Sequence, residues 1–296
     1  MPSDIEVIDA STATVGAFTV RRALPRRRLR TVGAWCFADH MGPAQVTETA
    51  GLDVGPHPHA GLQTVTWLME GEVLHRDSLG SEQLIRPGQL NLMTAGRGVV
   101  HSEEATGTYR GTVHGVQLWV AQPAAEREGP ADFAHLAELP RADVDRSTLT
   151  VIAGSFADVT SPARFGSELV GVEAVLRPGT SHWRLRPDFE YAVIALEGSV
   201  QIADAVAVPG QLATLGRGRT ELDVSAREAS RVLLLGGVPF PDPLVMWWNF
   251  VAGSREEITE AVAQWRAGGD RFGEVASRLP RIPSPSPPWL QSARLV

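Results

Sequence analysis

Lysine is absent from the 296-residue sequence, and all 27 basic residues are arginine. This absence excludes catalysis through a lysine Schiff base, attachment of pyridoxal phosphate and a Walker-A phosphate loop. Cysteine occurs once, at Cys36, which excludes an internal disulfide and any zinc or iron–sulfur site built from cysteines. No apolar run reaches the roughly 18 residues of a membrane span, and the N-terminus contains no apolar signal-peptide core. These absences predict a cytoplasmic protein that does not cross a membrane.

Basic residues are also fewer than acidic residues. Acidic residues outnumber basic ones, 34 to 27, and the net charge is −7. Such a chain lacks the overall basic footprint of a nucleic-acid-binding domain. The exception is the segment 21–30, in which six of ten residues are arginine. We interpret it as a solvated strand and turn that attracts polyanions only at low salt, and we predict no specific nucleic-acid binding.

Glycine and proline are frequent, at 29 and 21 residues, which favours many short strands over long helices. Short apolar runs bounded by these residues predict the strands of a sandwich or barrel. The strand-like runs are 33–38, 65–69, 89–93, 116–120, 149–153, 169–176, 192–196, 211–215 and 231–235.

Three short motifs recur in the same order in the second half of the chain. The pairs are Glu70–Val73 with Glu197–Val200, Pro87–Leu90 with Pro209–Leu212, and Gly96–Gly98 with Gly216–Gly218. An ordered recurrence of this kind indicates a duplicated β unit. We predict a first domain at 1–125, a polar, proline-containing linker at 126–147, and a second domain at 148–296.

One helix is predicted near the C-terminus. Ser254 and Glu257 have the spacing of a capping box, and an apolar face follows with helical periodicity before two glycines end it. The residues of that face are Ile258, Ala261, Val262 and Trp265. The proline-rich tail 280–288 cannot pair in a sheet, so we expect it to run extended over the surface.

Two pairs of metal-ligand residues lie within the first β unit. His57 and His59 are two residues apart, and so are His101 and Glu103. On a strand, residues two apart point to the same face, so each pair can approach one ion. If the strands are neighbours, three imidazoles and one carboxylate converge, a ligand set that suits one divalent Fe, Mn, Ni, Cu or Zn ion.

The other five histidines are weaker candidates for a metal site. We interpret His75 as part of a surface ion pair or turn, and His40 as a buried or capping residue. His114 is either structural or a hydrogen-bond partner of a ligand. His135 and His182 have no partner at ligand spacing and are assigned no role.

The repeat offsets predict which residues stand where the metal ligands would be in the second unit. Arg184 and Arg186 correspond to the first histidine pair, and Glu221 and Asp223 correspond to His101 and Glu103. Two arginines and two acids do not suit a cation but can form bidentate ion pairs. We therefore expect these residues to pair within the second barrel, which would hold no metal.

The segment HPHAGLQTVTWLMEGEVLHRDSLGSEQLIRPGQLNLMTAGRGVVHSEE, residues 57–104, resembles the signature of the pirins, a family of the cupin superfamily. Residues 39–43, 114–120 and 243–251 are also similar to pirin segments. The resemblance implies an all-β fold of two tandem cupin barrels of jelly-roll type. It also implies one metal ion, usually Fe(II), bound in the first barrel by His57, His59, His101 and Glu103.

One position departs from the general cupin motif, which has glutamate where this chain has Gln63. An amide cannot accept a proton as a carboxylate does, so a base at this position would be absent here. Metal binding does not depend on it, because Glu103 can supply the carboxylate.

The resemblance implies two functions of different classes. One is a dioxygenase of the quercetin 2,3-dioxygenase type, in which a flavonol and O₂ react at the metal and Glu103 acts as the catalytic base. Its cavity would be apolar, and Trp67, Leu92 and Met93 are candidate wall residues, although a core position is the simpler interpretation of each. The alternative is an iron-dependent redox-sensing or regulatory protein that binds a transcription factor or a metabolic enzyme.

Overall fold

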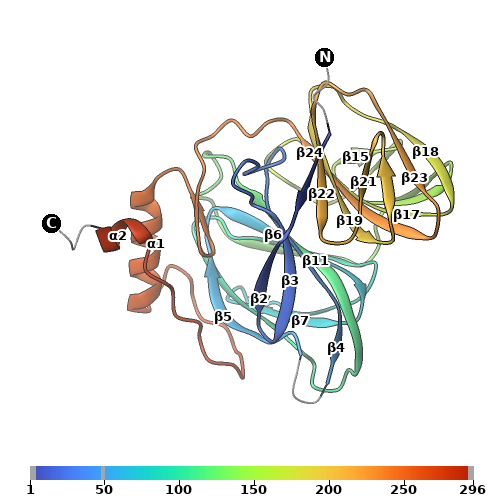
Figure 1. Ribbon diagram of the computed structural model, residues 1–296. Helices are drawn as coiled ribbons and strands as arrows, with labels where there is room; N and C mark the ends of the chain where they lie inside the picture. The colour runs from blue at the N-terminus through green and yellow to red at the C-terminus, as the bar shows by residue number, and fades with distance from the viewer. Residues whose placement is uncertain (1–4, 48–50, 293–296) are drawn as a thin grey trace.

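The computed structural model describes residues 5–47 and 51–292. It is an all-β molecule of two barrels, each built from one seven-stranded and one four-stranded sheet, with a helix near the C-terminus (Figure 1). Within the described residues, no helix is both long enough and apolar enough to span a membrane. The predicted pair of barrels with a short C-terminal helix is confirmed.

The N-terminal barrel consists of eleven strands. Its large sheet has the order β12 (Asp132–Leu136), β9 (Leu90–Thr94), β6 (Leu62–Glu70), β11 (Gly111–Ala121), β4 (Trp35–Val46), β3 (Phe18–Leu24) and β2 (Ser11–Val15). Its small sheet has the order β5 (Val54–His59), β10 (Val99–Glu104), β7 (Val73–Asp77) and β8 (Glu82–Ile85).

The C-terminal barrel repeats this arrangement. Its large sheet has the order β1 (Glu6–Asp9), β22 (Gln211–Arg217), β19 (Glu190–Glu197), β24 (Ser230–Gly237), β17 (Leu169–Leu176), β14 (Ser147–Ala153) and β13 (Arg141–Val144). Its small sheet has the order β18 (Gly179–Arg184), β23 (Glu221–Ala226), β20 (Val200–Ile202) and β21 (Ala205–Ala207). The remaining elements are the hairpins β15–β16 (Ser155–Phe156, Val159–Thr160) and β25–β26 (Val245–Trp247, Phe250–Ala252) and the helices α1 (Arg255–Ala267) and α2 (Pro288–Ser292).

The sequence repeat marks the same turns in both barrels. Gly71 follows β6 with φ 92°, and Gly198 follows the equivalent β19 with φ 71°. Gly88 precedes β9 with φ 80°, and Gly210 precedes the equivalent β22 with φ 96°. Glycine adopts these positive φ values without the steric cost of a side chain, so the repeated motifs are repeated turns.

The two large sheets pack against each other through a shared apolar core. Trp35 of β4 is fully buried there, and its indole N–H lies 3.1 Å from Val170 O and 3.2 Å from Gly236 O of the other barrel. The core also contains Val65 and Trp67 of β6. Because the outward faces of both large sheets are apolar, the barrels bury each other and form one unit.

Each end of the chain packs against the other barrel. The N-terminal strand β1 pairs with β22 in the C-terminal barrel, whereas α1 packs on Ala60 and Val100 of the N-terminal barrel. The predicted linker 126–147 includes two strands, since β12 pairs with β9 and β13 pairs with β14. The proposed domain limits stay a prediction, and these contacts cross them.

Helix α1 forms as the sequence predicts. The Ser254 hydroxyl accepts a hydrogen bond from the Glu257 N–H, and Gly268 ends the helix in the left-handed conformation. The four residues of the predicted apolar face are all buried. Residues 280–287 contain no strand or helix, and the short helix α2, which the sequence did not predict, follows them.

The interior of the C-terminal barrel corrects one prediction. Trp183 and Leu222 point into an apolar core, so their neighbours Arg184 and Glu221 are exposed, as is Asp223. Arg186 is exposed as well and pairs at the surface with Asp188 at 2.6 Å and with Glu168 at 2.9 Å. The predicted ion pairs inside the barrel were wrong because strand alternation puts these residues on the outer face.

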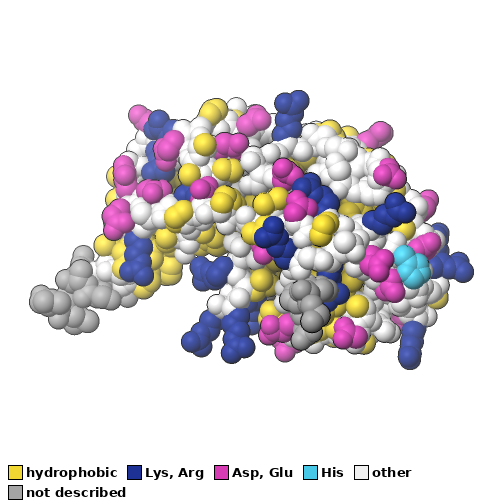
Figure 2. Space-filling view, turned by 90° about the horizontal axis from the view of Figure 1, so that it is seen from above, with side chains coloured by type: hydrophobic (Ala, Val, Ile, Leu, Met, Phe, Trp, Pro, Cys, Tyr) yellow, Lys and Arg dark blue, Asp and Glu magenta, His cyan; other side chains and the backbone are white. Residues whose placement is uncertain are grey.

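The arginine-rich segment 21–30 is part strand and part turn. Arg21 and Arg22 lie half-buried in β3, whereas Arg27, Arg28 and Arg30 are exposed. Arginines, acidic residues and apolar side chains are interspersed over the face seen in Figure 2.

Candidate metal centre

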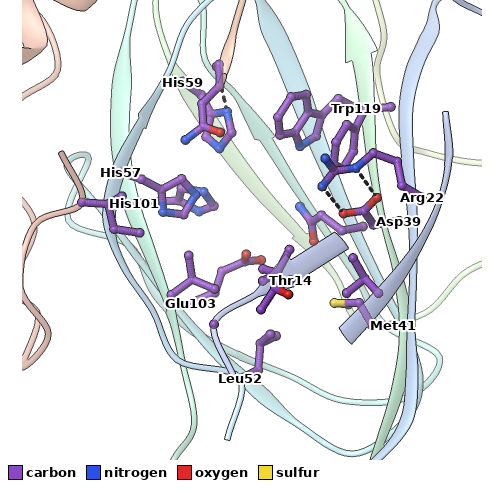
Figure 3. A pocket seen from close by; sticks show the side chains of 18 of the residues that line it. Thr14, Arg22, Asp39, Met41, Leu52, His57, His59, His101, Glu103 and Trp119 are labelled. Atoms are coloured by element: carbon purple, nitrogen blue, oxygen red, sulfur yellow. Dashed lines mark hydrogen bonds and ion pairs between the residues drawn. The ribbon is translucent and has the colours of Figure 1, made fainter. Parts of the chain in front are cut away.

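Three imidazoles meet between two neighbouring strands of the N-terminal barrel. β5 and β10 are antiparallel, and His57 lies directly opposite His101. His59 is two residues along β5 and points to the same side (Figure 3). One ring nitrogen from each of the three histidines lies within 4.8 Å of the others, and all three side chains are buried. Among the described residues, this is the group with the geometry of a metal site.

The hydrogen bonds of these rings leave the same atom available in each. His57 Nδ1 is 2.8 Å from the carbonyl oxygen of Gly55, and His59 Nδ1 is 3.2 Å from that of Asn249. His101 Nδ1 is 3.3 Å from His75 Nδ1, while its buried Nε2 has no hydrogen-bond partner. Metal-binding histidines typically use one nitrogen for the metal and donate from the other. The donor set therefore fits a divalent metal ion at the three Nε2 atoms.

Burial keeps these rings neutral. It lowers the pKa of His57 to about 4, and it lowers the pKa of His59 and of His101 well below the ordinary value, with neighbouring imidazoles acting in the same direction. Neutral imidazole is the form that binds a metal, so the site needs to release no proton near neutral pH.

Glu103 lines the same cavity but stands apart from the compact group of imidazoles. It follows His101 by two residues on β10, across a bulge, and its Oε1 accepts a hydrogen bond from the Thr66 hydroxyl at 3.3 Å. Burial raises the pKa of the Glu103 carboxyl group. Its role as a fourth ligand stays a prediction.

The imidazoles open into a cavity of about 430 Å³. Aromatic and apolar side chains form much of its wall, including Phe37, Met41, Leu52 and Trp119. Phe37 and Trp119 stack at 4.0 Å between ring centroids, and His59 meets the Trp119 ring edge-on at 5.1 Å. A cavity of this size and lining suits a small aromatic molecule.

An ion pair stands opposite the histidines, as Figure 3 shows. The Arg22 guanidinium donates from Nε and Nη2 to both carboxylate oxygens of Asp39 at 2.8 Å. Burial nevertheless raises the pKa of the Asp39 carboxyl group. Sequence reasoning missed this pair; the alternation of Phe37, Asp39 and Met41 along β4 was the signal that could have placed Asp39 inside.

The C-terminal part of the chain completes the site. Asn249 and Trp248, in the turn between β25 and β26, line the cavity, and so does Ile282 of the tail. The Ile282 N–H donates to Pro56 O at 2.8 Å, next to His57. The site therefore depends on contacts between residues 190 or more apart in sequence.

His75 is not at the surface, contrary to prediction. It is buried, and its Nε2 lies 3.0 Å from Asp77 Oδ2. Val73, His75 and Asp77 alternate inward along β7, a pattern that could have revealed their position. Hydrogen bonds from His75 and Ser81 lower the pKa of the Asp77 carboxyl group, although burial acts to raise it.

Several other predicted residues lie away from the cavity. Gln63 faces the C-terminal barrel, where its Nε2 donates to Arg164 O at 3.1 Å. The three candidate wall residues belong to apolar cores outside the cavity: Trp67, Leu92 and Met93.

The remaining histidines take structural positions. Buried His40 and His114 face each other at 2.8 Å between their Nε2 atoms, and His114 Nδ1 lies 3.2 Å from Glu197 Oε1 of the other barrel. His114 is therefore structural rather than a partner of a ligand. His135 bonds to Asn91, and exposed His182 bonds to Asp223.

Comparison with known proteins agrees with this architecture. The family model described as Pirin matches residues 17–120, and the model of the Pirin C-terminal cupin domain matches residues 172–273. A Pseudomonas aeruginosa protein named putative quercetin 2,3-dioxygenase is 44% identical over 96% of this chain and 91% of its own length. A pirin-like protein of Caulobacter vibrioides is 39% identical over 88% of this chain and 93% of its own length.

A solved crystal structure has the same fold as this chain. The crystal structure of a quercetin 2,3-dioxygenase from Acinetobacter baumannii superposes with a TM-score of 0.94 at 41% identity, covering 96% of both chains. The sequence matches and the paired barrels agree, and the chain belongs to the pirin family of two-barrel cupin proteins.

Proposed function

We propose that the chain is a metal-dependent dioxygenase of the quercetin 2,3-dioxygenase type that acts on a flavonol-like substrate and O₂. The observation that carries the proposal is the orientation of three buried imidazoles. All are held through Nδ1, and their Nε2 atoms converge beside a cavity of about 430 Å³ with stacked aromatic rings in its wall. The relatives named for this activity support the choice of reaction.

The proposed ligands are His57, His59, His101 and Glu103, and the proposed metal is Fe(II). Three nitrogens and one oxygen also suit Mn, Ni, Cu or Zn, and a six-coordinate ion keeps open positions for exogenous ligands. When bound, such an ion supplies a Lewis acid for the flavonol oxygen and a path for electrons to O₂.

The residues of the chain would bind and orient the substrate. The ring stack of Phe37 and Trp119 offers an aromatic surface beside His59. The charge of Arg22 is balanced by Asp39, which suits an uncharged aromatic substrate better than an anion. The Glu103 carboxylate, positioned by the Thr66 hydroxyl, would accept the proton of the flavonol 3-hydroxyl group.

The first test is metal content and O₂ uptake with quercetin, measured on one anaerobic preparation. Wild-type protein should contain one metal ion per chain and consume O₂. The double substitution His57→Ala and His59→Ala should abolish both. Full metal retention in this variant would contradict the ligand assignment. Metal-loaded wild-type protein that consumes no O₂ would favour the regulatory binding function instead.

The second test separates the two proposed roles of Glu103. Glu103→Gln removes the base but leaves three imidazoles, which suffice to hold a divalent ion in three-histidine zinc sites. We expect a substantial share of the metal to remain and most O₂ uptake to be lost, on the order of the 10²- to 10⁴-fold contribution of a general base. Undiminished uptake would exclude both roles.

A further inference from the structure

A buried pair of titratable residues, His75 and Asp77, lies behind the metal ligands and has no part in the proposed reaction. Both are on β7, which pairs with β10 so that Asp77 is opposite His101. Their exposed fractions are 3% and 4%. The His75 ring also stacks on Phe133, at 4.5 Å between ring centroids and 16° between planes, which holds its orientation.

The two carboxylate oxygens of Asp77 face different hydrogen-bond donors. Its Oδ1 accepts the backbone N–H groups of Leu79 at 2.9 Å and Ser81 at 3.0 Å. Its Oδ2 lies 3.0 Å from His75 Nε2. A carboxylate only accepts hydrogen bonds, so the proton of His75 is on Nε2.

The position of the His75 proton determines which ring nitrogen of His101 is protonated. With Nε2 protonated, neutral His75 has a lone pair on Nδ1. The 3.3 Å contact between the Nδ1 atoms of His75 and His101 can hold only one proton, which must then belong to His101. Neutral His101 is left with a lone pair on Nε2, the atom that faces the other two ligand histidines.

We infer that His75 and Asp77 are positioning residues of the metal centre, which fix His101 in the tautomer whose Nε2 can bind the metal. The inference rests on the proposed metal site. It also explains a difference between the ligands: His57 and His59 donate directly to backbone carbonyls, whereas His101 reaches a carboxylate only through a second imidazole.

Asp77→Asn tests the chain of hydrogen bonds with almost no change of shape. The two backbone donors hold the amide oxygen in place of Oδ1, so the amide NH₂ faces His75 Nε2. His75 must then accept there and donate from Nδ1, which makes His101 accept at Nδ1 and places its proton on Nε2. That proton occupies the lone pair needed by the metal.

Metal affinity is the first readout, measured by chelator competition with Fe(II), and with Ni(II) as an oxygen-stable probe. We expect Asp77→Asn to bind roughly 10- to 100-fold more weakly than wild type, as for other residues that orient ligand histidines. The matched control is Asp223→Asn, which alters an aspartate bonded to His182 on the surface of the other barrel and should leave affinity unchanged. Equal affinity in wild type and Asp77→Asn would overturn the inference.

The second readout needs no metal. Two-bond ¹H–¹⁵N correlation spectra of metal-free, ¹⁵N-histidine-labelled protein distinguish the two imidazole tautomers, and loss of its signals in His101→Gln assigns His101. We expect the proton on Nδ1 in wild type and on Nε2 in Asp77→Asn. An unchanged His101 tautomer would overturn the inference. Wild-type protein with the expected tautomer but no metal affinity would refute the proposed function and leave the positioning role of Asp77 and His75 supported.

Discussion

Gln63 allows a sharp test of how strand alternation places side chains around the metal centre. Along β6, Gln63 shares a face with Val65 and Trp67, which pack between the barrels. Its amide Nε2 donates to Thr94 Oγ1 at 2.9 Å and to Arg164 O at 3.1 Å. We expect Gln63→Glu, which restores the residue of the general cupin motif, to destabilise the contact between barrels and to leave the metal centre unchanged.

The loss of folding stability in Gln63→Glu depends on the protonation state of the new carboxyl group. When protonated, the group can donate to Arg164 O and replace the amide. When ionised, it faces that carbonyl oxygen in a buried site, so its folded-state pKa is raised. A rise of about two units corresponds to about 2.7 kcal/mol. Because the folded pKa is the higher one, the stability is retained at low pH and lost as the pH rises above the unfolded value.

Thermal unfolding at about pH 4, below the ordinary glutamate pKa of about 4.3, and at about pH 8 measures this effect. At roughly 2–4 °C per kcal/mol for a chain of this size, the midpoint of Gln63→Glu should fall about 5–11 °C below wild type at the higher pH and match it closely at the lower one. Gln63→Met, which removes the amide without adding a charge, should show a deficit that does not depend on pH. A pH-independent deficit in Gln63→Glu, or a loss of metal binding, would refute this placement.

Three further predictions concern the buried residues Trp35 and Cys36. Trp35→Phe removes the indole N–H that bonds to Val170 O and Gly236 O, and unpaired buried carbonyls cost about 1–3 kcal/mol, so calorimetry should show a midpoint lower by roughly 2–12 °C; an unchanged midpoint would exclude a role in joining the barrels. Burial raises the pKa of the Cys36 thiol to about 12, so iodoacetamide near neutral pH should modify it only after unfolding, as followed by mass spectrometry. Cys36 does not line the cavity, so Cys36→Ser should retain all metal, and a loss of metal with the fold preserved would contradict its position.

Several strands, helix α1 and the grouping of three histidines followed from the sequence alone. The strand-like runs became strands, and the capping box and apolar face of α1 formed as expected. His57, His59 and His101 came together as their spacing predicted. These features are local: a capping residue acts within one turn, and residues two apart on a strand share a face whatever the strand packs against.

The tertiary structure decided which face of each strand points inward. Alternation places Gln63 with Val65 and Arg184 with Arg186, but only pairing with distant strands shows that both pairs face away from their barrel interiors. A shift of one residue in register exchanges the two faces of a strand, and local sequence does not specify that choice.

The same reason applies to the surroundings of the three histidines. The bond from His101 to His75 depends on the register between β10 and β7, and the bond from His59 to Asn249 joins segments 190 residues apart. The sequence determined which imidazoles can bind a metal. The folded chain decided what surrounds and orients them, because those contacts form only when distant strands and the C-terminal segment pack together.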